Sequence, residues 1–220
     1  MFLHTSQLTF EFFFSTMVKE STMNLALFHS LSFVFLSLIY STSFSMVFCC
    51  KILKYSLNAS LLLRKQLKDL SRNPVDGFSA GLVDDSNLFE WNVTIIGPPD
   101  TLYEGGYFNA IMSFPPNYPN SPPSVRFTSD MWHPNVYPDG RVCISILHAP
   151  GDDPNGYELA SERWSPVHTV ETILLSIISM LSSPNDESPA NIDAAKEWRE
   201  TKEDFRRKVS RIVRRSQESM

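Results

Sequence analysis

The sequence predicts an α+β fold, with its helices and strands in separate parts of the chain. A stretch with leucines at helical spacing comes first, four stretches with alternating apolar residues follow, and further helical stretches close the chain. This order of helix, strands and helices is typical of an α+β domain.

The first predicted helix lies just after residue 58. Leu63, Leu67 and Leu70 repeat at helical spacing and form an apolar stripe. The basic residues beside this stripe are Arg64, Lys65 and Lys68. Because proline does not continue a helix, we expect the helix to end near Asn73 and Pro74, with a basic face available for docking.

Four strands are predicted next, at residues 78–82, 88–96, 107–114 and 125–128. Each has the period-2 character of a strand with one buried face. The stretches between them, at residues 84–87, 97–106 and 115–123, are rich in turn-forming residues. Four consecutive strands with short links favour an antiparallel meander.

A central helix is predicted to follow Ser165, which suits the N-cap position, with Pro166 in the first turn. Its apolar residues are too numerous to be exposed, and they are Val170, Ile173, Leu174, Ile177, Ile178 and Leu181. A final helical stretch from about residue 200 carries Phe205, Val209, Ile212 and Val213 on one face. Its other positions are basic, at Arg206, Arg207, Lys208, Arg211, Arg214 and Arg215.

Composition limits the class of protein. The chain has 220 residues, of which 43% are apolar, enough for one compact domain plus an appendage. Its formal charge of -5 argues against nucleic acid as the main partner, because phosphate contacts require an excess of clustered Lys and Arg. We therefore expect a protein or small-molecule partner.

Cysteine usage points to a free thiol. There are three cysteines, and Cys49 and Cys50 are adjacent, which does not suit a disulfide framework. No Cys/His pair has the spacing of zinc ligands, so no metal is expected. A reducing compartment follows as the default.

The first 57 residues differ from the rest of the chain. They contain no Gly, Pro or Asp and only five charged side chains, and about half of them are Phe, Ser or Leu. All 15 prolines and all 8 glycines lie further on. The sequence therefore predicts an N-terminal hydrophobic extension over residues 1–57 and a core domain over residues 58–220.

Three interpretations of the extension are open. Residues 25–50 carry no formal charge and are long enough to span a bilayer, and Lys51 and Lys54 would keep the following domain in the cytosol. Cys49 and Cys50 would then be candidates for acylation. The extension could instead be a cleaved targeting segment. We favour the third interpretation, that it is not part of the working protein, since serines dilute the apolar stretch.

Cys143 stands in an unusual setting. The sequence His133-Pro134-Asn135 precedes it, with eight residues from the asparagine to the cysteine, and an acidic insertion separates it from Trp164. This arrangement predicts a thiol nucleophile on a short loop with an amide side chain nearby. The alternative is a buried cysteine that acts as a small apolar residue.

Taken together, residues 58–220 resemble the ubiquitin-conjugating (E2) enzyme family. The motifs that carry this resemblance are the first helix, the meander, Tyr118-Pro119, Pro122-Pro123, His133-Pro134-Asn135, Cys143 and Trp164-Ser165-Pro166. The lengthened acidic insertion is similar to that of the G-type subgroup, as are the segments 73–75, 77–82 and 97–106. Residues 1–57 have no counterpart in the usual G-type architecture, which leaves localisation open.

The resemblance implies that Cys143 accepts the C-terminal carboxyl of ubiquitin as a thioester from an activating (E1) enzyme and passes it to a lysine, directly or through a ligase (E3). Since a thioester is a good acyl donor to an amine, this chain is expected to need no cofactor, and the E1 would consume the ATP. Asn135 would donate its amide to the oxyanion, worth roughly 10²- to 10³-fold in rate, or stabilise the loop, and the two roles are compatible. His133 would hold the loop rather than act as a base, and Pro134 would stiffen the turn.

The incoming lysine must also lose a proton. Ser145, together with Ser188 near the position of an acidic gate residue in many E2 enzymes, would flank its approach, but serine is no anionic acceptor. The acidic insertion could supply the charge through Asp152, Asp153, Glu158 or Glu162, with His148 near the thiol in sequence. The alternative is that the insertion is only a solvated loop.

The resemblance also implies partner surfaces. The ligase-facing rim, where an apolar knob would meet a RING-type domain, would comprise Pro119, Asn120, Trp164, Ser165, Pro166 and Val167. E1 and ligases would share the basic face formed by Arg64, Lys65 and Lys68. Alternatively, Trp164 belongs to the core and the basic face is only solvated.

The implied function is transfer of ubiquitin to protein substrates with an E3, building polyubiquitin chains for the proteasome, including in ER-associated degradation. The implied location is cytoplasmic or nuclear, or the ER membrane with the core domain in the cytosol if the anchor is genuine. One alternative, a catalytically silent E2-like scaffold, predicts loss of Cys143 or Asn135, and both are present. Another, a Cys/His hydrolase, needs a base and an orienting third residue. Chain order allows His133, His148 or His168 as that base.

Overall fold

The structure, a computed structural model, describes residues 56–218. The predicted N-terminal extension therefore lies almost entirely outside the described residues, as does the whole charge-free stretch of residues 25–50. Within residues 56–218, no helix is both long and apolar enough to span a membrane.

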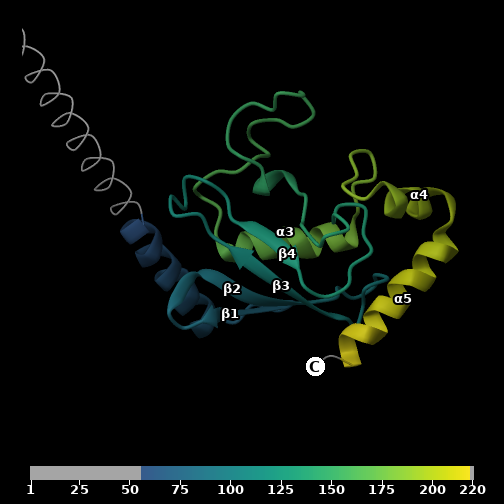
Figure 1. Cartoon of the computed structure of the whole chain (residues 1–220), viewed down its shortest axis with the longest axis horizontal. Coiled ribbons are helices and arrows are strands. Elements are labelled where there is room, and N and C mark those ends of the chain that lie inside the picture. Colours follow the sequence, from purple (N-terminus) through teal and green to yellow (C-terminus); the bar gives the residue numbers. More distant parts are fainter. Residues whose placement is uncertain (1–55, 219–220) are drawn as a thin grey trace, which may run out of the picture. The chain divides into compact units, whose positions relative to one another are not determined.

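The core domain is built on a four-stranded antiparallel sheet (Figure 1). Its strands are β1 (Phe78–Asp84), β2 (Asn87–Ile96), β3 (Tyr107–Ser113) and β4 (Ser124–Phe127), hydrogen-bonded in the order β1-β2-β3-β4. The predicted meander is thus confirmed. Ala110 lies opposite Val93 on one side and Phe127 on the other, so alternate residues of three strands share one buried face.

Helices supply the rest of the core. Residues 56–72 are helical, and α3 (Val170–Ser182), α4 (Ile192–Glu200) and α5 (Lys202–Glu218) follow the sheet in sequence. In Figure 1, α3 runs behind the sheet, and its buried residues join those of the strands in one apolar core. Gln66 of the first helix accepts a hydrogen bond of 2.8 Å from the backbone N–H of Val170, which joins that helix to the start of α3.

The predicted start of the central helix is wrong. Ser165 and Pro166 lie in a turn closed by a 3.0 Å hydrogen bond from the His168 backbone N–H to the Ser165 carbonyl. The N-cap of α3 is Thr169, whose side chain and that of Thr172 cap each other's backbone N–H. This reciprocal capping box pairs two N–H groups that a helix end would otherwise leave free, and it places the start four residues later than predicted.

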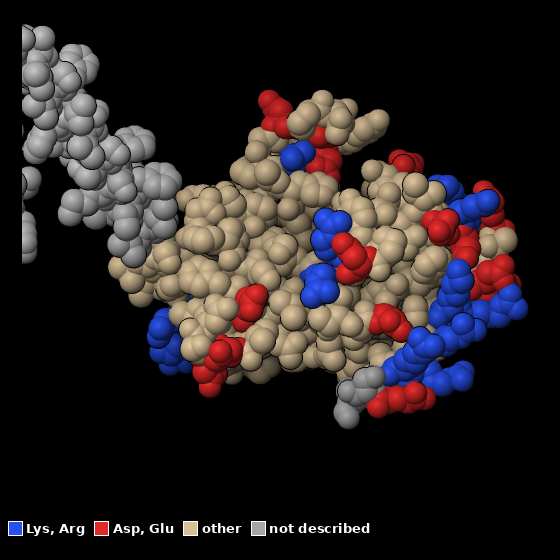
Figure 2. Space-filling view, in the orientation of Figure 1, with Lys and Arg blue, Asp and Glu red and all other residues tan. Residues whose placement is uncertain are grey.

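The last helix has the predicted amphipathic character. Phe205 and Val209 of α5 are buried, and Ile212 and Val213 pack against the core from its edge. Most of its basic residues are exposed, and Figure 2 shows Lys and Arg side chains gathered along this end of the domain. Lys208 is the partly buried one, with its ammonium 4.0 Å from the centre of the Trp132 ring.

Candidate active site

The segment His133-Pro134-Asn135 is fixed from two directions. The His133 ring bonds to the Met180 carbonyl, near the end of α3, at 3.1 Å. The Pro134 carbonyl accepts hydrogen bonds from the backbone N–H groups of Ala190 and Asn191, at 2.8 and 2.9 Å. The loop between α3 and α4 therefore holds this segment in place.

The structure gives His133 a supporting position. Its side chain is fully buried, and its Nδ1 accepts the backbone N–H of Asn135 at 2.9 Å, so Nε2 carries the proton that Met180 accepts. Both ring nitrogens are occupied, and burial lowers the pKa of His133 to about 4 against the smaller opposing effect of the Met180 hydrogen bond. This geometry fits the loop-holding role expected of His133 and does not fit the role of a catalytic base.

We expect His133 to make the fold sensitive to mild acid. Because its folded pKa of about 4 lies below the ordinary 6.5, the unfolded chain binds a proton between these values that the folded chain does not. The neutral His133 ring therefore contributes fully to the free energy of unfolding above pH 6.5. This contribution, roughly 3 kcal/mol, is lost as the pH falls towards 4. Urea unfolding at several pH values should show a steeper loss for the native protein than for His133→Gln. An equal decrease of the unfolding free energy with falling pH in the two proteins would contradict this role of His133.

Asn135 is also buried, with 4% of its surface exposed. Its amide nitrogen donates to the Asn185 carbonyl at 2.7 Å, and its Oδ1 accepts the Asn185 backbone N–H at 2.8 Å. Its own carbonyl accepts the backbone N–H of Cys143 at 3.0 Å. Asn135 thus ties the cysteine to the loop after α3, and the amide retains one further N–H for an oxyanion.

Cys143 follows Val142, whose backbone pairs with β4, and precedes the short 3₁₀ helix η1 (Ser145–Leu147). Its side chain is partly buried and the sulfur is not part of a disulfide. The Sγ atom lies 3.5 Å from Nε2 of His148. The thiol is therefore partly accessible and has an imidazole nitrogen beside it.

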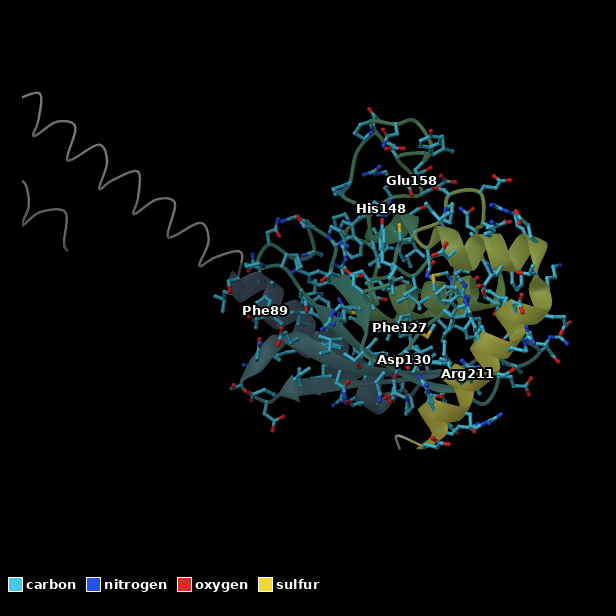
Figure 3. The ribbon with its side chains drawn as sticks, turned by 45° about the vertical axis from the view of Figure 1, so that its right-hand side comes forward. Phe89, Phe127, Asp130, His148, Glu158 and Arg211 are labelled. Atoms are coloured by element: carbon cyan, nitrogen blue, oxygen red, sulfur yellow. The ribbon has the colours of Figure 1, made fainter. Side chains whose placement is uncertain are left out.

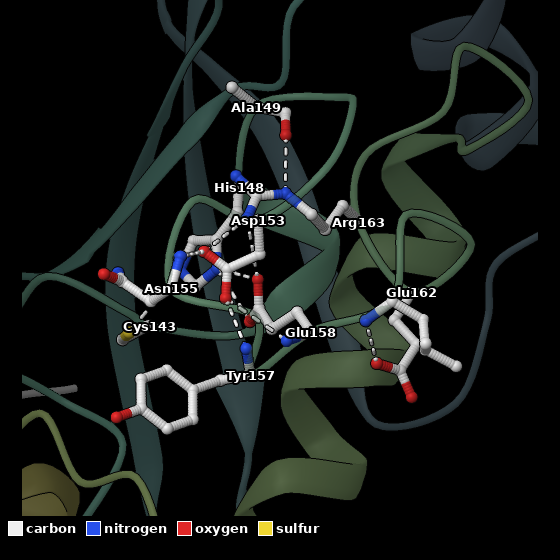
Figure 4. A network of polar contacts seen from close by, with 10 residues as sticks. Cys143, His148, Ala149, Asp153, Asn155, Tyr157, Glu158, Glu162 and Arg163 are labelled. Atoms are coloured by element: carbon white, nitrogen blue, oxygen red, sulfur yellow. Dashed lines mark hydrogen bonds and ion pairs between the residues drawn. The ribbon is translucent and has the colours of Figure 1, made fainter.

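His148 is held by Glu158, from the acidic insertion. The Nδ1 atom of His148 lies 2.9 Å from each carboxylate oxygen of Glu158 (Figure 4). Figure 3 shows the two side chains together at the base of the segment that projects from the domain. Sequence reasoning placed both residues near the thiol but did not pair them, since ten positions separate them.

The insertion has an internal framework and is more than a solvated loop. The Asp153 carboxylate accepts the backbone N–H groups of Asn155, Tyr157 and Glu158, at 3.1, 2.7 and 3.3 Å. Arg163 bridges Asp153 and Glu158 at 3.4 and 3.3 Å. The hydrogen bond from Asn155 is the main reason that the pKa of Asp153 is lowered.

The predicted role of Asp153 therefore needs correction. Its side chain is only 9% exposed and is occupied by the loop's own backbone, so it organises the insertion rather than facing an incoming lysine. Asp152 is exposed, as is Ser188 in the loop after α3. Among the described residues, neither of these two side chains is hydrogen-bonded to Cys143.

Tyr137 is a neighbour of the thiol that sequence reasoning missed. The negative charge of the Cys143 thiolate, followed by a hydrogen bond with it, raises the pKa of the Tyr137 phenol. The phenol therefore stays neutral beside the sulfur. Its only signal in the sequence was its place two residues after Asn135.

The predicted rim is partly exposed, and its tryptophan is buried. Asn120, Pro166 and Val167 are exposed, and Val167 shows 78% of its surface, while Pro119 and Ser165 are half-buried. The Trp164 ring is 2% exposed, and its Nε1 donates to the Pro119 carbonyl at 2.8 Å. Direct partner contact by Trp164 is thus corrected to a supporting role. The basic face is exposed at Arg64, Lys65 and Lys68.

The described residues contain no group of three or more His, Cys, Asp or Glu side chains arranged to hold a metal ion.

The chemistry that the geometry supports directly is acyl transfer through a thiol. A partly buried Cys143 has a histidine within reach, and that histidine is oriented by a carboxylate.

Comparison with known proteins agrees with this chemistry. The family model described as ubiquitin-conjugating enzyme matches residues 62–213. Ubiquitin-conjugating enzyme E2 7 of Arabidopsis thaliana is 81% identical over 160 residues, 73% of this chain and 96% of that protein. Ubiquitin-conjugating enzyme E2 G2 of Homo sapiens is 58% identical over 154 residues, 70% of this chain and 93% of that protein. The solved structure of human ubiquitin-conjugating enzyme E2 G1 matches with a TM-score of 0.51 and 58% identity, over 57% of this chain and 96% of that one.

The fold, the thiol and these relatives define the class, and the chain belongs to the ubiquitin-conjugating enzyme (E2) family. Within this family it is of the G type. It is a transferase that forms a thioester with ubiquitin, and its partners are ubiquitin, an E1 and E3 ligases.

Proposed function

We propose that this enzyme builds polyubiquitin chains on substrates of RING-type ligases, marking them for the proteasome, including in ER-associated degradation. The observation that carries the proposal is the acidic insertion folded beside the partly buried Cys143. A charged segment next to the thioester is suited to receiving the lysine of an incoming ubiquitin.

The charges of the insertion support this assignment. Asp152 is exposed, and Glu162 is also exposed although one of its oxygens accepts the Leu159 backbone N–H at 2.9 Å, whereas Asp153 and Glu158 are engaged within the loop. The exposed carboxylates are available to attract a lysine ammonium, and the engaged ones keep the loop in position. Chain building needs a lysine that is presented repeatedly in one orientation, and an ordered loop provides this better than a flexible one.

The exposed rim supports a ligase partner. Val167 is an exposed apolar residue on a turn, next to Pro166, and the tryptophan behind it is fixed in the core. An exposed apolar side chain with rigid packing behind it is suited to dock into an apolar pocket of a partner. We assign this rim to a RING-type domain and the exposed Arg64, Lys65 and Lys68 to contacts shared by E1 and ligases.

Two further elements complete the proposal. The enzyme works without a resident cofactor, because the E1 supplies an already activated ubiquitin. It acts in the cytoplasm or nucleus, or at the ER membrane facing the cytosol if residues 1–57 form an anchor. Detection of an N-terminal peptide from the native protein decides between these, since a start near Asn58 would rule out the anchor.

Val167→Asp is expected to reduce the ligase-stimulated rate roughly 10-fold, which corresponds to about 1.4 kcal/mol of lost docking energy. Charging by E1 and ATP should remain normal, because Val167 lies outside the thiol site. The measurement is discharge of ubiquitin from the full-length enzyme with and without a RING domain. Val83→Asp, at an exposed valine of β1, is the matched control. Equal RING stimulation of both variants would contradict the rim assignment.

The degradation role has a separate test. A substrate modified by this enzyme with E1 and a RING ligase is given to purified proteasomes. Its degradation at a higher rate than the unmodified substrate supports the proposal. Persistence of a substrate that carries chains would overturn the degradation role and leave the transferase activity intact.

A further inference from the structure

The thiol of Cys143, the imidazole of His148 and the carboxylate of Glu158 form a series of contacts. The Sγ atom of Cys143 is 3.5 Å from Nε2 of His148, and Nδ1 of His148 is 2.9 Å from both oxygens of Glu158 (Figure 4). Because the two contacts use opposite nitrogens of one ring, the carboxylate and the thiol can act on the same imidazole at once.

The charge of Glu158 fixes the ring's proton. Partial burial raises the pKa of Glu158, but hydrogen bonds from His148 and Ser145 and the charges nearby outweigh burial, so the pKa lies below its ordinary value. The carboxylate is therefore ionised at neutral pH and can only accept. In the neutral ring the proton then resides on Nδ1, and the lone pair of Nε2 points towards Cys143.

Arg163 and Asp153 hold this carboxylate in place. Arg163 donates to Glu158 at 3.3 Å and, through Nε, to the Ala149 carbonyl at 2.8 Å, so it spans the insertion next to His148. Asp153 accepts the backbone N–H of Glu158 itself. The carboxylate is thus positioned by both its side-chain and its backbone neighbours, and the exposed fraction of its side chain is only 19%.

From this geometry we propose that His148 is the proton acceptor for the Cys143 thiol and that Glu158 is its positioning residue. The proposal rests on Cys143 as the thiol that receives ubiquitin. During charging, the S–H proton of Cys143 moves to Nε2 of His148 and the resulting thiolate attacks the thioester carbonyl of the E1-bound ubiquitin. A new S–C bond forms at Cys143, the S–C bond to the E1 cysteine breaks, and the departing E1 thiolate takes up a proton that His148 releases.

The other groups that face this pair are consistent with the step. Tyr137 stays protonated beside the sulfur, because the Cys143 thiolate raises the pKa of its phenol, and its O–H can donate to the thiolate. The positive charge of Arg163 partly offsets the negative charge of the Glu158 carboxylate. His133 is excluded as the acceptor because both of its nitrogens are occupied in the core.

The test measures thiol reactivity without any partner. Full-length enzyme carrying Cys49→Ser and Cys50→Ser retains Cys143 as its single thiol, and its alkylation by iodoacetamide is followed from pH 5 to 10. We expect His148→Gln to move the midpoint of this profile about one pH unit higher, which lowers the rate at pH 7 about tenfold. Glu158→Gln should shift the midpoint in the same direction by less, since the ring remains but its orientation and charge partner are lost.

His168→Gln is the matched control, because it removes a histidine whose ring packs near Trp164, 5.7 Å between centroids. Its profile should overlay that of the parent. Superimposable profiles for the parent and for both His148→Gln and Glu158→Gln, with all variants folded by circular dichroism, would overturn the proposal. If the alkylation profile shifts in His148→Gln but not in Glu158→Gln, Glu158 is not a positioning residue for His148.

Charging by E1 separates this proposal from the function above. If the His148→Gln profile is shifted while the parent enzyme is charged by E1 but is not stimulated by RING ligases, the proton acceptor is sustained and the ligase assignment is overturned. Unchanged alkylation with normal chain building would do the reverse.

Discussion

Replacing Cys143 with alanine is expected to abolish the ubiquitin thioester completely. The sulfur of Cys143 is the acyl acceptor, and neither the imidazole of His148 nor the amide of Asn135 forms a stable thioester in its place. The measurement is incubation of the full-length enzyme with E1, ATP and ubiquitin, followed by a non-reducing gel. The native protein should give an adduct that a reductant removes.

Cys143→Ser sharpens this experiment. A serine hydroxyl forms an ester, which resists thiol reductants and yields to alkali, so the adduct should persist in reductant if it forms on this side chain. Cys49→Ser and Cys50→Ser serve as controls and should charge normally. A reductant-sensitive adduct on Cys143→Ala would move the acceptor to one of those two cysteines and refute the site.

Asn135→Ala is expected to slow discharge of ubiquitin to free lysine by on the order of 10²-fold, because the transition state loses an amide donor to its oxyanion. The protein should also lose roughly 2 kcal/mol of stability, since the Asn185 N–H and carbonyl lose their partners. Single-turnover discharge measures the first effect and urea unfolding the second.

Asn191→Ala is the matched control for this variant. Asn191 is as buried as Asn135, and its side chain caps α4 by accepting the backbone N–H of Ala194 at 3.0 Å. Its loss should cost about 1 kcal/mol and leave discharge unchanged. If Asn135→Ala slows charging and discharge equally, or if both variants slow discharge alike, Asn135 acts only by supporting the loop.

The sequence predicted the fold well because strands and helices here follow local periodicity. Alternating residues in β2 and β3 and the stripe in α3 are visible without tertiary information. The start of α3 was mispredicted because two capping signals lie four residues apart. Only the packed structure, in which Gln66 accepts the Val170 N–H, favours Thr169 over Ser165.

The sequence predicted the site residues that lie in a recognisable motif. It did not predict the contacts that depend on how the acidic insertion folds. Cys143 and Asn135 stood out by sequence. The different roles of Asp153 and Glu158 could not be predicted, because both are acidic residues in one turn-rich stretch. Which carboxylate caps the loop and which reaches His148 depends on the path of the backbone and on Arg163.

Trp164 connects the predicted ligase-facing rim with the thiol site through two hydrogen bonds. Its indole N–H holds the Pro119 carbonyl, and its backbone N–H holds the carbonyl of His148 at 3.1 Å. A partner that displaces Pro119 must therefore strain or break a hydrogen bond of Trp164, whose backbone holds the histidine beside the sulfur. By thermodynamic reciprocity, a partner that binds more tightly to the loaded than to the unloaded enzyme must favour the loaded state by the same factor.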